Sequence, residues 1–393
     1  MSPPPADLDP ASPDRSTAAG PAPAVPSSGR PVIADDPPQG SPLASAIGSV
    51  IGDERSGPWL SATADLPEAA LLHPRRAFVS QRVAALRARI AEIAELVEVP
   101  DLCLYLTGSY GRFEASPYSD LDIFFMHKGT FQHNALLPVQ KTLIDAALIR
   151  GCRDLGFPEL TGGGQYLRIH YLDDIRSSLG GPQDDAQNFF TARMLLLLES
   201  LPLYNDALYR DVIRAMISSY YRDYSDHEKN FRPIFFQNDI MRYWKTMCLN
   251  YEHRRNRLPD DPIKHAEFHL KNFRLKFSRL LTCFSMIIAV VHLSRRAVLR
   301  DSELLGLVLA SPWQRLIEVA RDTGSRSLLG QMVDLYVWFL DSTAAPKEQC
   351  ARWIADRATR SQAFSRASEF GGLLFTLLQR VAEGTDALRY LVM

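Results

Sequence analysis

The chain has 393 residues, of which 46% are hydrophobic, so its length predicts two domains with enough apolar material for packed cores. The formal net charge of −1 and the sequence pI of about 6.8 exclude a general electrostatic attraction to nucleic acid or to an anionic membrane. Five dispersed cysteines without a CxxC pair favour free thiols over a disulfide framework or a zinc site. We therefore expect a cytosolic protein without a signal peptide.

The first part of the chain is rich in proline, alanine, serine and glycine, and half of the 26 prolines lie before residue 60. Such a segment cannot bury enough apolar surface to offset the entropy lost on ordering, so residues 1–70 are predicted to be a disordered tail. The short apolar stretch 43–51 is a candidate partner-binding arm, although a solvated tail is the simpler interpretation.

A folded domain is predicted to begin near residue 74. Between residues 74 and 97, apolar side chains recur at three- and four-residue spacing with arginines between them, which predicts an amphipathic helix. The apolar run 102–106 then predicts a strand that ends in a turn containing glycine and serine. After a polar loop, the apolar run 123–126 predicts a second strand.

Asp120 and Asp122 open this second strand and are candidate metal ligands. Because side chains alternate along a strand, the two carboxylates point to the same face, roughly 6 to 7 Å apart along the chain. Carboxylates so placed repel each other unless a cation lies between them. Their hard oxygen atoms suit Mg²⁺, or Mn²⁺ in its place, with water and substrate phosphate oxygens in the remaining coordination positions.

The turn before the polar loop is suited to bind phosphate. Gly108 allows a backbone to approach a phosphate closely, and Gly111 keeps the following turn open, so that N–H groups can face an anion. Ser109 adds a hydroxyl group, and Arg112 can make a bidentate phosphate contact. Together with the two aspartates, these residues predict a metal-triphosphate site.

The stretch GSYGRFEASPYSDLDIFF, residues 108–125, resembles the signature of the DNA polymerase β nucleotidyltransferase superfamily, in which GS is followed by DxD on a strand. It is most similar to the branch of the PII-protein uridylyltransferases. The resemblance implies a five-stranded mixed sheet and Mg²⁺-dependent transfer of a nucleoside monophosphate from a nucleoside triphosphate (NTP), with release of pyrophosphate. By matching position, Gly108 and Ser109 would hold the triphosphate, and Asp120 and Asp122 would bind the metal.

The rest of the nucleotidyltransferase domain, residues 74–205, is predicted to contain three further elements. These are a helix at 138–155, a third strand at 165–172 and a closing helix at 189–201. Many members of the superfamily carry a third carboxylate on the third strand, where it acts as general base.

This chain departs from that pattern, because Tyr166, Arg168 and His170 share one face of the predicted third strand. His170 has a pKa suited to proton transfer, and Asp173 and Asp174 follow the strand. The general base is therefore open among His170, Asp173 and Asp174, or none of them.

From residue 206 to 393 nearly every segment predicts a helix. Superfamily members place a helical domain beside the sheet, with basic side chains that close on the triphosphate. By that analogy Lys245, Lys276 and Arg279 are candidates, and the alternative is that each lies on a solvated helix face. The most apolar run, 281–293, is too short to span a bilayer and fits a buried helix, so no membrane association is expected.

The sequence thus predicts an α+β domain of the polymerase β type, followed by an all-helical domain. The predicted function is metal-dependent transfer of a nucleotide from an NTP, such as ATP or UTP, to a hydroxyl acceptor. A protein side chain is the favoured acceptor, and RNA or a small molecule is the alternative. A rival hypothesis is a catalytically silent nucleotide-sensing or protein-docking module, which the missing third acid favours. The oligomeric state is open.

Overall fold

The computed structural model describes residues 67–160, 164, 167–295 and 298–392. The predicted disordered tail falls almost entirely on residues 1–66, which lie outside the described residues. The first described element is a short 3₁₀ helix, η2 (Pro67–Leu72), which leads directly into the first long helix.

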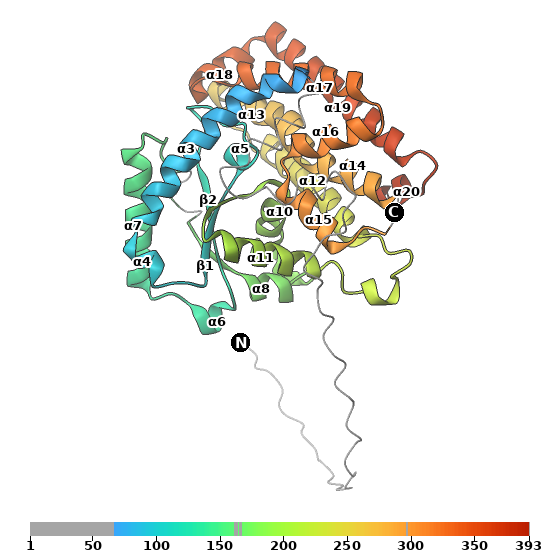
Figure 1. Ribbon diagram of the computed structural model, residues 1–393. Coiled ribbons are helices and arrows are strands. Elements are labelled where there is room, and N and C mark those ends of the chain that lie inside the picture. The colour runs from blue at the N-terminus through green and yellow to red at the C-terminus, as the bar shows by residue number, and fades with distance from the viewer. Residues whose placement is uncertain (1–66, 161–163, 165–166, 296–297, 393) are drawn as a thin grey trace, which may run out of the picture. The chain divides into compact units, whose positions relative to one another are not determined.

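Four strands of the described residues form one mixed sheet in the order β3-β2-β1-β4, of which Figure 1 labels the neighbouring strands β1 and β2. The central strand β1 (Leu102–Thr107) is antiparallel to β2 (Asp122–His127) and to β4 (Leu201–Tyr204), and β2 is parallel to β3 (Ile169–Tyr171). The predicted α+β class is therefore confirmed.

The number of strands corrects one expectation, because the resemblance implies five and the described residues form four. The third strand, predicted at 165–172, has only three residues in the structure. Leu172 already begins helix α8 (Leu172–Ser177), which shortens the strand at its end, and residues 165–166 lie outside the described part of the chain.

The two faces of the sheet are covered by different helices, because alternate residues of β1 enter different cores. Leu104 packs in one core, with helices α3 (His73–Ala91) and α7 (Pro138–Asp154). Tyr105 packs in the other core, with α10 (Phe189–Glu199) and α11 (Asp206–Ser218). All six β1 residues are buried, as expected for a strand covered on both faces.

The predicted first helix is confirmed with one interruption. Its apolar residues at three- and four-residue spacing form the buried face of α3, and Ile93 then adopts an extended conformation before the short helix α4 (Ala94–Val97). The predicted second helix, 138–155, matches α7 closely. The short helices in this part of the chain are α5 (Gly108–Gly111), α6 (Phe131–Asn134) and α9 (Pro182–Ala186).

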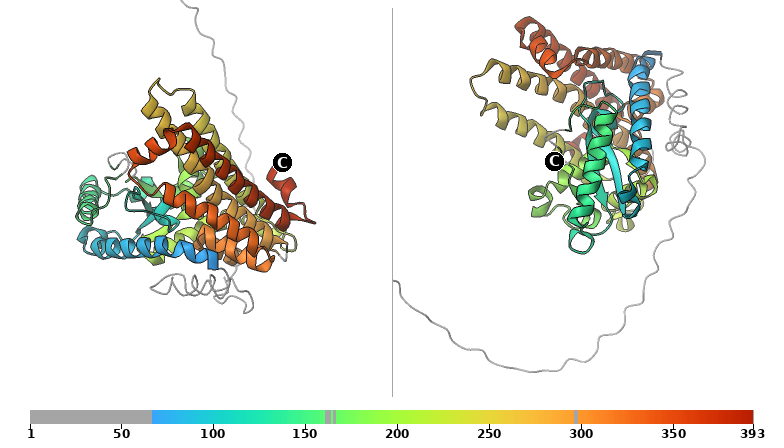
Figure 2. Two further views of the ribbon diagram at one scale, coloured as in Figure 1. Left: turned by 90° about the horizontal axis from the view of Figure 1, so that it is seen from above. Right: turned by 90° about the vertical axis from the view of Figure 1, so that its left-hand side faces the viewer.

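The regular structure of the described residues after 206 is helical, as the sequence predicts. It consists of α11 and of η4 (Tyr224–Asp226), α12 (Ile234–Arg255), α13 (Pro262–Arg274), the π-helical turn η5 (Leu275–Arg279), α14 (Leu280–Ser294), α15 (Asp301–Leu309), α16 (Pro312–Asp322), α17 (Arg326–Ser342), α18 (Lys347–Ala355), α19 (Arg357–Ala382) and α20 (Ala387–Val392). Figure 2 shows α12 and α13 as an antiparallel pair joined by a turn.

The core on the α10 side of the sheet continues into the helical region without a break. Tyr105 of β1, Leu196 of α10, Ile287 of α14 and Phe370 of α19 belong to one buried cluster. The helical region therefore packs directly on one face of the sheet, which brings residues far apart in the sequence to a common site.

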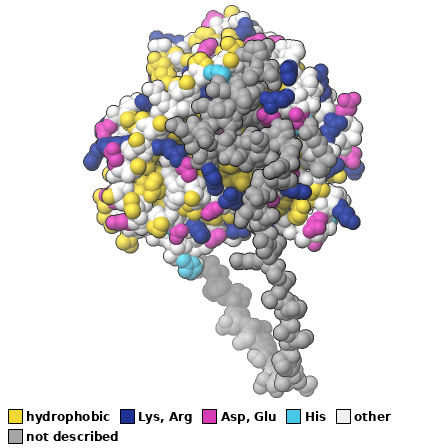
Figure 3. Space-filling view, viewed as in Figure 1, with side chains coloured by type: hydrophobic (Ala, Val, Ile, Leu, Met, Phe, Trp, Pro, Cys, Tyr) yellow, Lys and Arg dark blue, Asp and Glu magenta, His cyan; other side chains and the backbone are white. Residues whose placement is uncertain are grey.

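The helices α13, η5 and α14 form one continuous helix, Pro262–Ser294, which is long and apolar enough to cross a membrane by length and composition. Within this fold 72% of its most apolar window is buried, so the helix contributes to the core. Figure 3 shows acidic and basic side chains interspersed over one face of the molecule, in keeping with the net charge of −1.

Candidate functional site

The glycine-serine turn and the DxD segment meet at one edge of the sheet. β1 and β2 are antiparallel with Thr107 opposite Asp122, so the turn after β1 lies beside the start of β2. Gly108 has a φ of +67°, and a Cβ atom built on it would lie 2.7 Å from the Asp122 Oδ2 atom. Glycine is therefore favoured at this position for two reasons: its backbone conformation has a positive φ, and a Cβ atom would crowd the carboxylate.

The two predicted metal ligands flank the buried Leu121. Asp120 is exposed and precedes β2, whereas Asp122 is its first residue and is partly buried. Burial raises the pKa of Asp122, and the negative charge of Asp120 adds to this effect, whereas the positive charge of Arg279 opposes it. Ionised Asp122 is thus disfavoured in isolation, and a cation held between the carboxylates would offset that cost.

Both aspartates line a cavity of about 530 Å³, together with Gly108, Ser109 and Arg112. These residues form its sheet-side wall. A cavity of this volume lies within the range of about 300–1,000 Å³ that is typical of small-molecule sites.

The helical region contributes cationic side chains to the same cavity. Arg254 of α12, Lys271 and Arg274 of α13 and Lys347 of α18 form what we call the basic wall, and Arg279 of η5 pairs with Glu199 beside the sheet. The cavity therefore combines the carboxylates of the DxD segment with cations of the helical region.

Arg112, which the sequence predicts as a phosphate ligand, is already paired with two carboxylates in this structure. Its Nε donates to Glu114 at 2.8 Å and its Nη1 to Glu199 at 2.6 Å, and all three side chains are buried. Arg112 therefore holds the turn against the end of α10, although it also borders the cavity.

Glu199 joins the sheet-side turn to the helical region. Its carboxylate accepts hydrogen bonds from Arg112, Arg279 and Thr282, the last at 3.0 Å. Burial alone would raise the pKa of Glu199, but Arg279 and Arg112 lower it. A Cβ atom on Gly111 would lie 1.8 Å from the Glu199 carbonyl oxygen, so only glycine allows this close packing.

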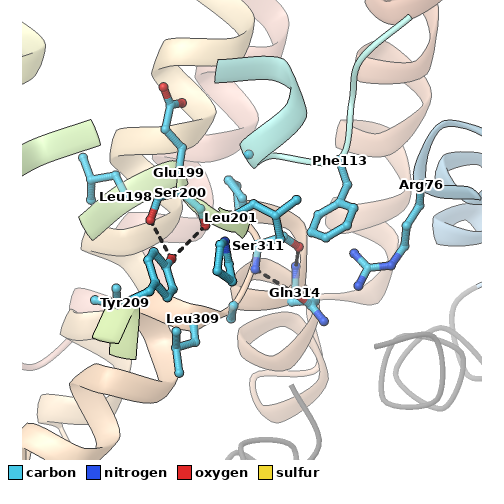
Figure 4. Close-up of a pocket in the computed structure, with 15 residues that line it drawn as sticks. Arg76, Phe113, Leu198, Glu199, Ser200, Leu201, Tyr209, Leu309, Ser311 and Gln314 are labelled. Carbon is cyan, nitrogen blue, oxygen red and sulfur yellow. Dashed lines mark hydrogen bonds between the residues drawn. The ribbon is translucent and has the colours of Figure 1, made fainter. Parts of the chain in front are cut away.

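Glu199 was not predicted as a site residue. The only sequence feature that could have indicated its role is that it is a single acidic residue in the apolar run of α10. Behind Glu199, its backbone lines a separate small cavity of about 30 Å³. Figure 4 shows that the Glu199 carboxylate points away from the other labelled residues of that cavity, and Tyr209 lies within hydrogen-bonding distance of Ser200 there. Of the network's members, Arg112, Glu114 and Arg279 line the larger cavity, and Glu199 lines the smaller one.

Of the three basic candidates taken from the helical segments, Arg279 lines the large cavity. Lys245 is exposed on α12, and neither it nor Lys276 is among the lining residues. The basic wall was not predicted, because its members come from three different helices and no local spacing joins them.

His170 lies away from the cavity. It pairs with Met126 in the parallel ladder between β2 and β3, and its ring stacks on Phe124 with a centroid distance of 5.9 Å. Only 7% of His170 is exposed, and burial lowers its pKa to about 4. A base with this pKa is poorly matched to neutral pH.

Asp173 and Asp174 lie at the other end of the ladder from Asp122. Because β2 and β3 are parallel, residues that follow β3 lie near the end of β2, whereas Asp122 begins it. Asp174 accepts a hydrogen bond from the Phe131 N–H at 2.9 Å, and Asp173 is 3.7 Å from Arg176. Neither lines the cavity, so the geometry assigns no general base among the three candidates.

In the described part of the chain, no three or more His, Cys, Asp or Glu side chains group together as a metal site. Two carboxylates beside a cavity still fit Mg²⁺, which typically takes one or two protein carboxylates and completes its coordination with water and substrate phosphates. A scan against models of protein families finds no match to this chain, and a search of curated proteins finds none.

Proposed function

We propose that the chain is a metal-dependent nucleotidyltransferase of the polymerase β type. It would move a nucleoside monophosphate from an NTP to a hydroxyl acceptor and release pyrophosphate. One observation carries the proposal: the Gly108–Ser109 turn, the Asp120/Asp122 pair and Arg279 line one cavity. That arrangement is complementary to a metal-bound polyanion.

Asp120 and Asp122 would hold Mg²⁺ or Mn²⁺, since both border the cavity and supply hard oxygen atoms. The bound ion would neutralise charge on the phosphate oxygens and polarise the reacting phosphorus centre. The raised pKa of Asp122 supports this assignment, because a carboxylate disfavoured in its ionised form gains most from a neighbouring cation.

The turn and Arg279 would orient the triphosphate. Ser109 supplies a hydroxyl group, Gly108 allows close approach of the backbone, and Arg279 places a positive charge on the cavity side of Glu199. The acceptor oxygen attacks the α phosphorus while the bond from that phosphorus to the bridging β oxygen breaks. Pyrophosphate leaves, and the hydroxyl proton passes to solvent water. Positioning and charge neutralisation supply most of the catalysis in such reactions.

The absence of an assigned base favours an acidic acceptor. A tyrosine phenol, with a pKa near about 10, loses its proton far more readily than a sugar or serine hydroxyl. A protein side chain is therefore the favoured acceptor. The near-neutral net charge gives less support to RNA.

A catalytically silent nucleotide-sensing module is the second candidate. It is favoured by one observation, that His170, Asp173 and Asp174 all lie outside the cavity lining. Such a module would bind a metal-NTP complex at the same residues without transferring the nucleotide.

The test is transfer of label from each α-labelled NTP, with Mg²⁺ or Mn²⁺, into the protein, RNA and small-molecule fractions of a cell extract. The variant Asp120→Asn/Asp122→Asn should lose transfer. The matched control Asp101→Asn, an exposed aspartate at the opposite end of β1, should retain it. Metal-dependent NTP binding without transfer in every condition would favour the silent module. If the double variant kept both NTP binding and label transfer, both proposals would be excluded.

A further inference from the structure

The basic wall is a second chemical feature of the cavity, distinct from the metal-triphosphate end. Its four cations come from three helices, α12, α13 and α18, so it depends on the tertiary fold. All four side chains are exposed to the solvent-filled space of the cavity or its rim.

Three of the four wall cations form no direct ion pair among the described residues, and Glu267 is the carboxylate that acts on both Lys271 and Lys347. Arg254, Lys271 and Arg274 form no ion pair with any described carboxylate. The pKa of Lys271 is lowered, first by burial and then by the positive charges of Arg254 and Lys347. Like charges are thus held close together, and an anionic ligand would relieve their repulsion.

The basic wall includes cations that lie well beyond Arg279 on the helix that carries both. Lys271 and Arg279 are eight residues apart on one continuous helix, which places them about 12 Å apart along its axis. Arg279 pairs with Glu199 beside the sheet, so Lys271 lines a different part of the cavity from the cation proposed to orient the triphosphate.

A carboxylate of the chain already pairs with a cation of the wall, which favours carboxylates as the anion that this surface would bind. Glu267 of α13 lies 3.0 Å from Lys347 and 3.4 Å from Lys264, so one carboxylate already bridges two cations at the edge of the wall. Beside it, Tyr251 and Phe268 stack with a centroid distance of 4.2 Å and an interplanar angle of 18°, and both line the cavity. Carboxylates spaced along a peptide would meet several cations, and this aromatic pair offers an apolar surface for a side chain between them.

We infer that the basic wall is the docking site for an acidic peptide segment of the protein acceptor, which carries the acceptor hydroxyl toward Asp122. The inference rests on the proposed function, because only a nucleotidyltransferase has a protein acceptor. Binding of the peptide can nevertheless be measured without nucleotide transfer. It identifies the acceptor by chemistry, as a hydroxyl side chain flanked by aspartate or glutamate.

The test uses the full chain, saturated with Mg²⁺ and an NTP, and fluorescence anisotropy of a labelled Asp/Glu peptide with one central tyrosine. The Arg254→Gln/Lys271→Gln variant should bind this peptide about tenfold or more weakly, since each charge-assisted hydrogen bond contributes about that factor. The control Arg255→Gln/Arg257→Gln removes the same charge from neighbouring residues that do not line the cavity, and its affinity should change less than about twofold.

Three results would overturn the inference. Equal losses in both double variants would show only long-range charge attraction. A loss of NTP affinity without loss of peptide affinity in Arg254→Gln/Lys271→Gln would assign the wall to the triphosphate. Tighter, wall-dependent binding of an oligouridylate would assign it to RNA. In the Asp120→Asn/Asp122→Asn background, Arg254→Gln/Lys271→Gln should still weaken peptide binding about tenfold or more. The failure of the proposed function and the failure of the docking site are therefore distinguishable.

Discussion

Gly108 joins the backbone of the turn to the Asp122 carboxylate, and its replacement tests that contact. Gly108→Ala should lower the free energy of unfolding by about 1–2 kcal/mol, because a Cβ atom is strained at a φ of +67°. It should also reduce label transfer about a hundredfold, since the added atom displaces Asp122. Denaturant unfolding and the transfer assay measure the two effects.

The control is Gly384→Ala, since Gly384 has a φ of +70° and no atom within 4 Å of its added Cβ. It should show the stability loss without the loss of transfer. Equal transfer in the two variants would mean that the Gly108 contact does not position Asp122 for the reaction.

His170 predicts a measurable pH dependence of stability. Its pKa is about 4 in the folded protein, against an ordinary value of 6.5, so between these values the unfolded chain binds a proton that the folded chain does not. The free energy of unfolding should therefore fall as the pH drops from about 6.5 to about 4, with a contribution of roughly 3 kcal/mol from this residue.

Chemical unfolding at several pH values, with wild type beside His170→Phe, measures this contribution. Between pH 6.5 and pH 4, the free energy of unfolding of His170→Phe should fall less than that of the wild type. The control His253→Phe, at an exposed position on α12, should show the same fall as the wild type. Parallel pH profiles for wild type and His170→Phe would show that the buried imidazole is not the titrating group.

At the scale of residues, the sequence predicts those parts of the site that are close together in the chain. Gly108 and Asp122 are recognisable because a strand, a turn and a second strand follow one another within a short segment. The partners of Arg112 are not recognisable in the same way, because Glu199 is 87 residues away. Only the fold shows that this arginine is already paired.

Helices α9, α10 and α12 are joined by a buried ion network that depends on Arg193. Its guanidinium donates to Asp184 at 2.7 and 2.8 Å and to Asp239 at 3.1 Å, and Tyr220 completes the network. Arg193→Met leaves the buried Asp184 with only the more distant Arg242, at 3.8 Å, as a cation among the described residues, so we expect a loss of about 3–5 kcal/mol in the free energy of unfolding.

The matched control is Arg214→Met, which removes an exposed pair with Asp211 on α11. It should cost less than about 1 kcal/mol, since exposed ion pairs contribute little. Similar losses in the two variants, measured by urea unfolding, would contradict a special role for the buried network.

At the scale of elements, the sequence predicts long amphipathic helices better than short strands. The buried face of α3 follows its apolar spacing closely, whereas β3 is three residues long and gives too short a pattern to define its ends. β4 (Leu201–Tyr204) was not predicted as a strand at all, because LPLY contains a proline and directly follows a helix. Its pairing with β1 is decided by tertiary structure.

For the whole molecule, the cavity depends on the continuity between the sheet and the helical region. Its lining comes from Arg75, from residues 108–122 and from residues 247–347, which share no local sequence pattern. The sequence therefore predicts the carboxylate side of the site and the helical class of the second half. It does not predict which helical cations face the carboxylates, because this depends on how α12, α13 and α18 pack.

The most direct test of the account compares α-labelled and γ-labelled NTP in parallel reactions of the full chain with Mg²⁺ and a cell extract. We predict that α label enters an acceptor in the same amount as pyrophosphate is released, and that γ label appears only in pyrophosphate. The variant Asp120→Asn/Asp122→Asn should abolish acceptor labelling and pyrophosphate release, whereas Asp101→Asn should retain them. Transfer of γ label to an acceptor, or undiminished α transfer by the double variant, would contradict nucleotidyl transfer at this site.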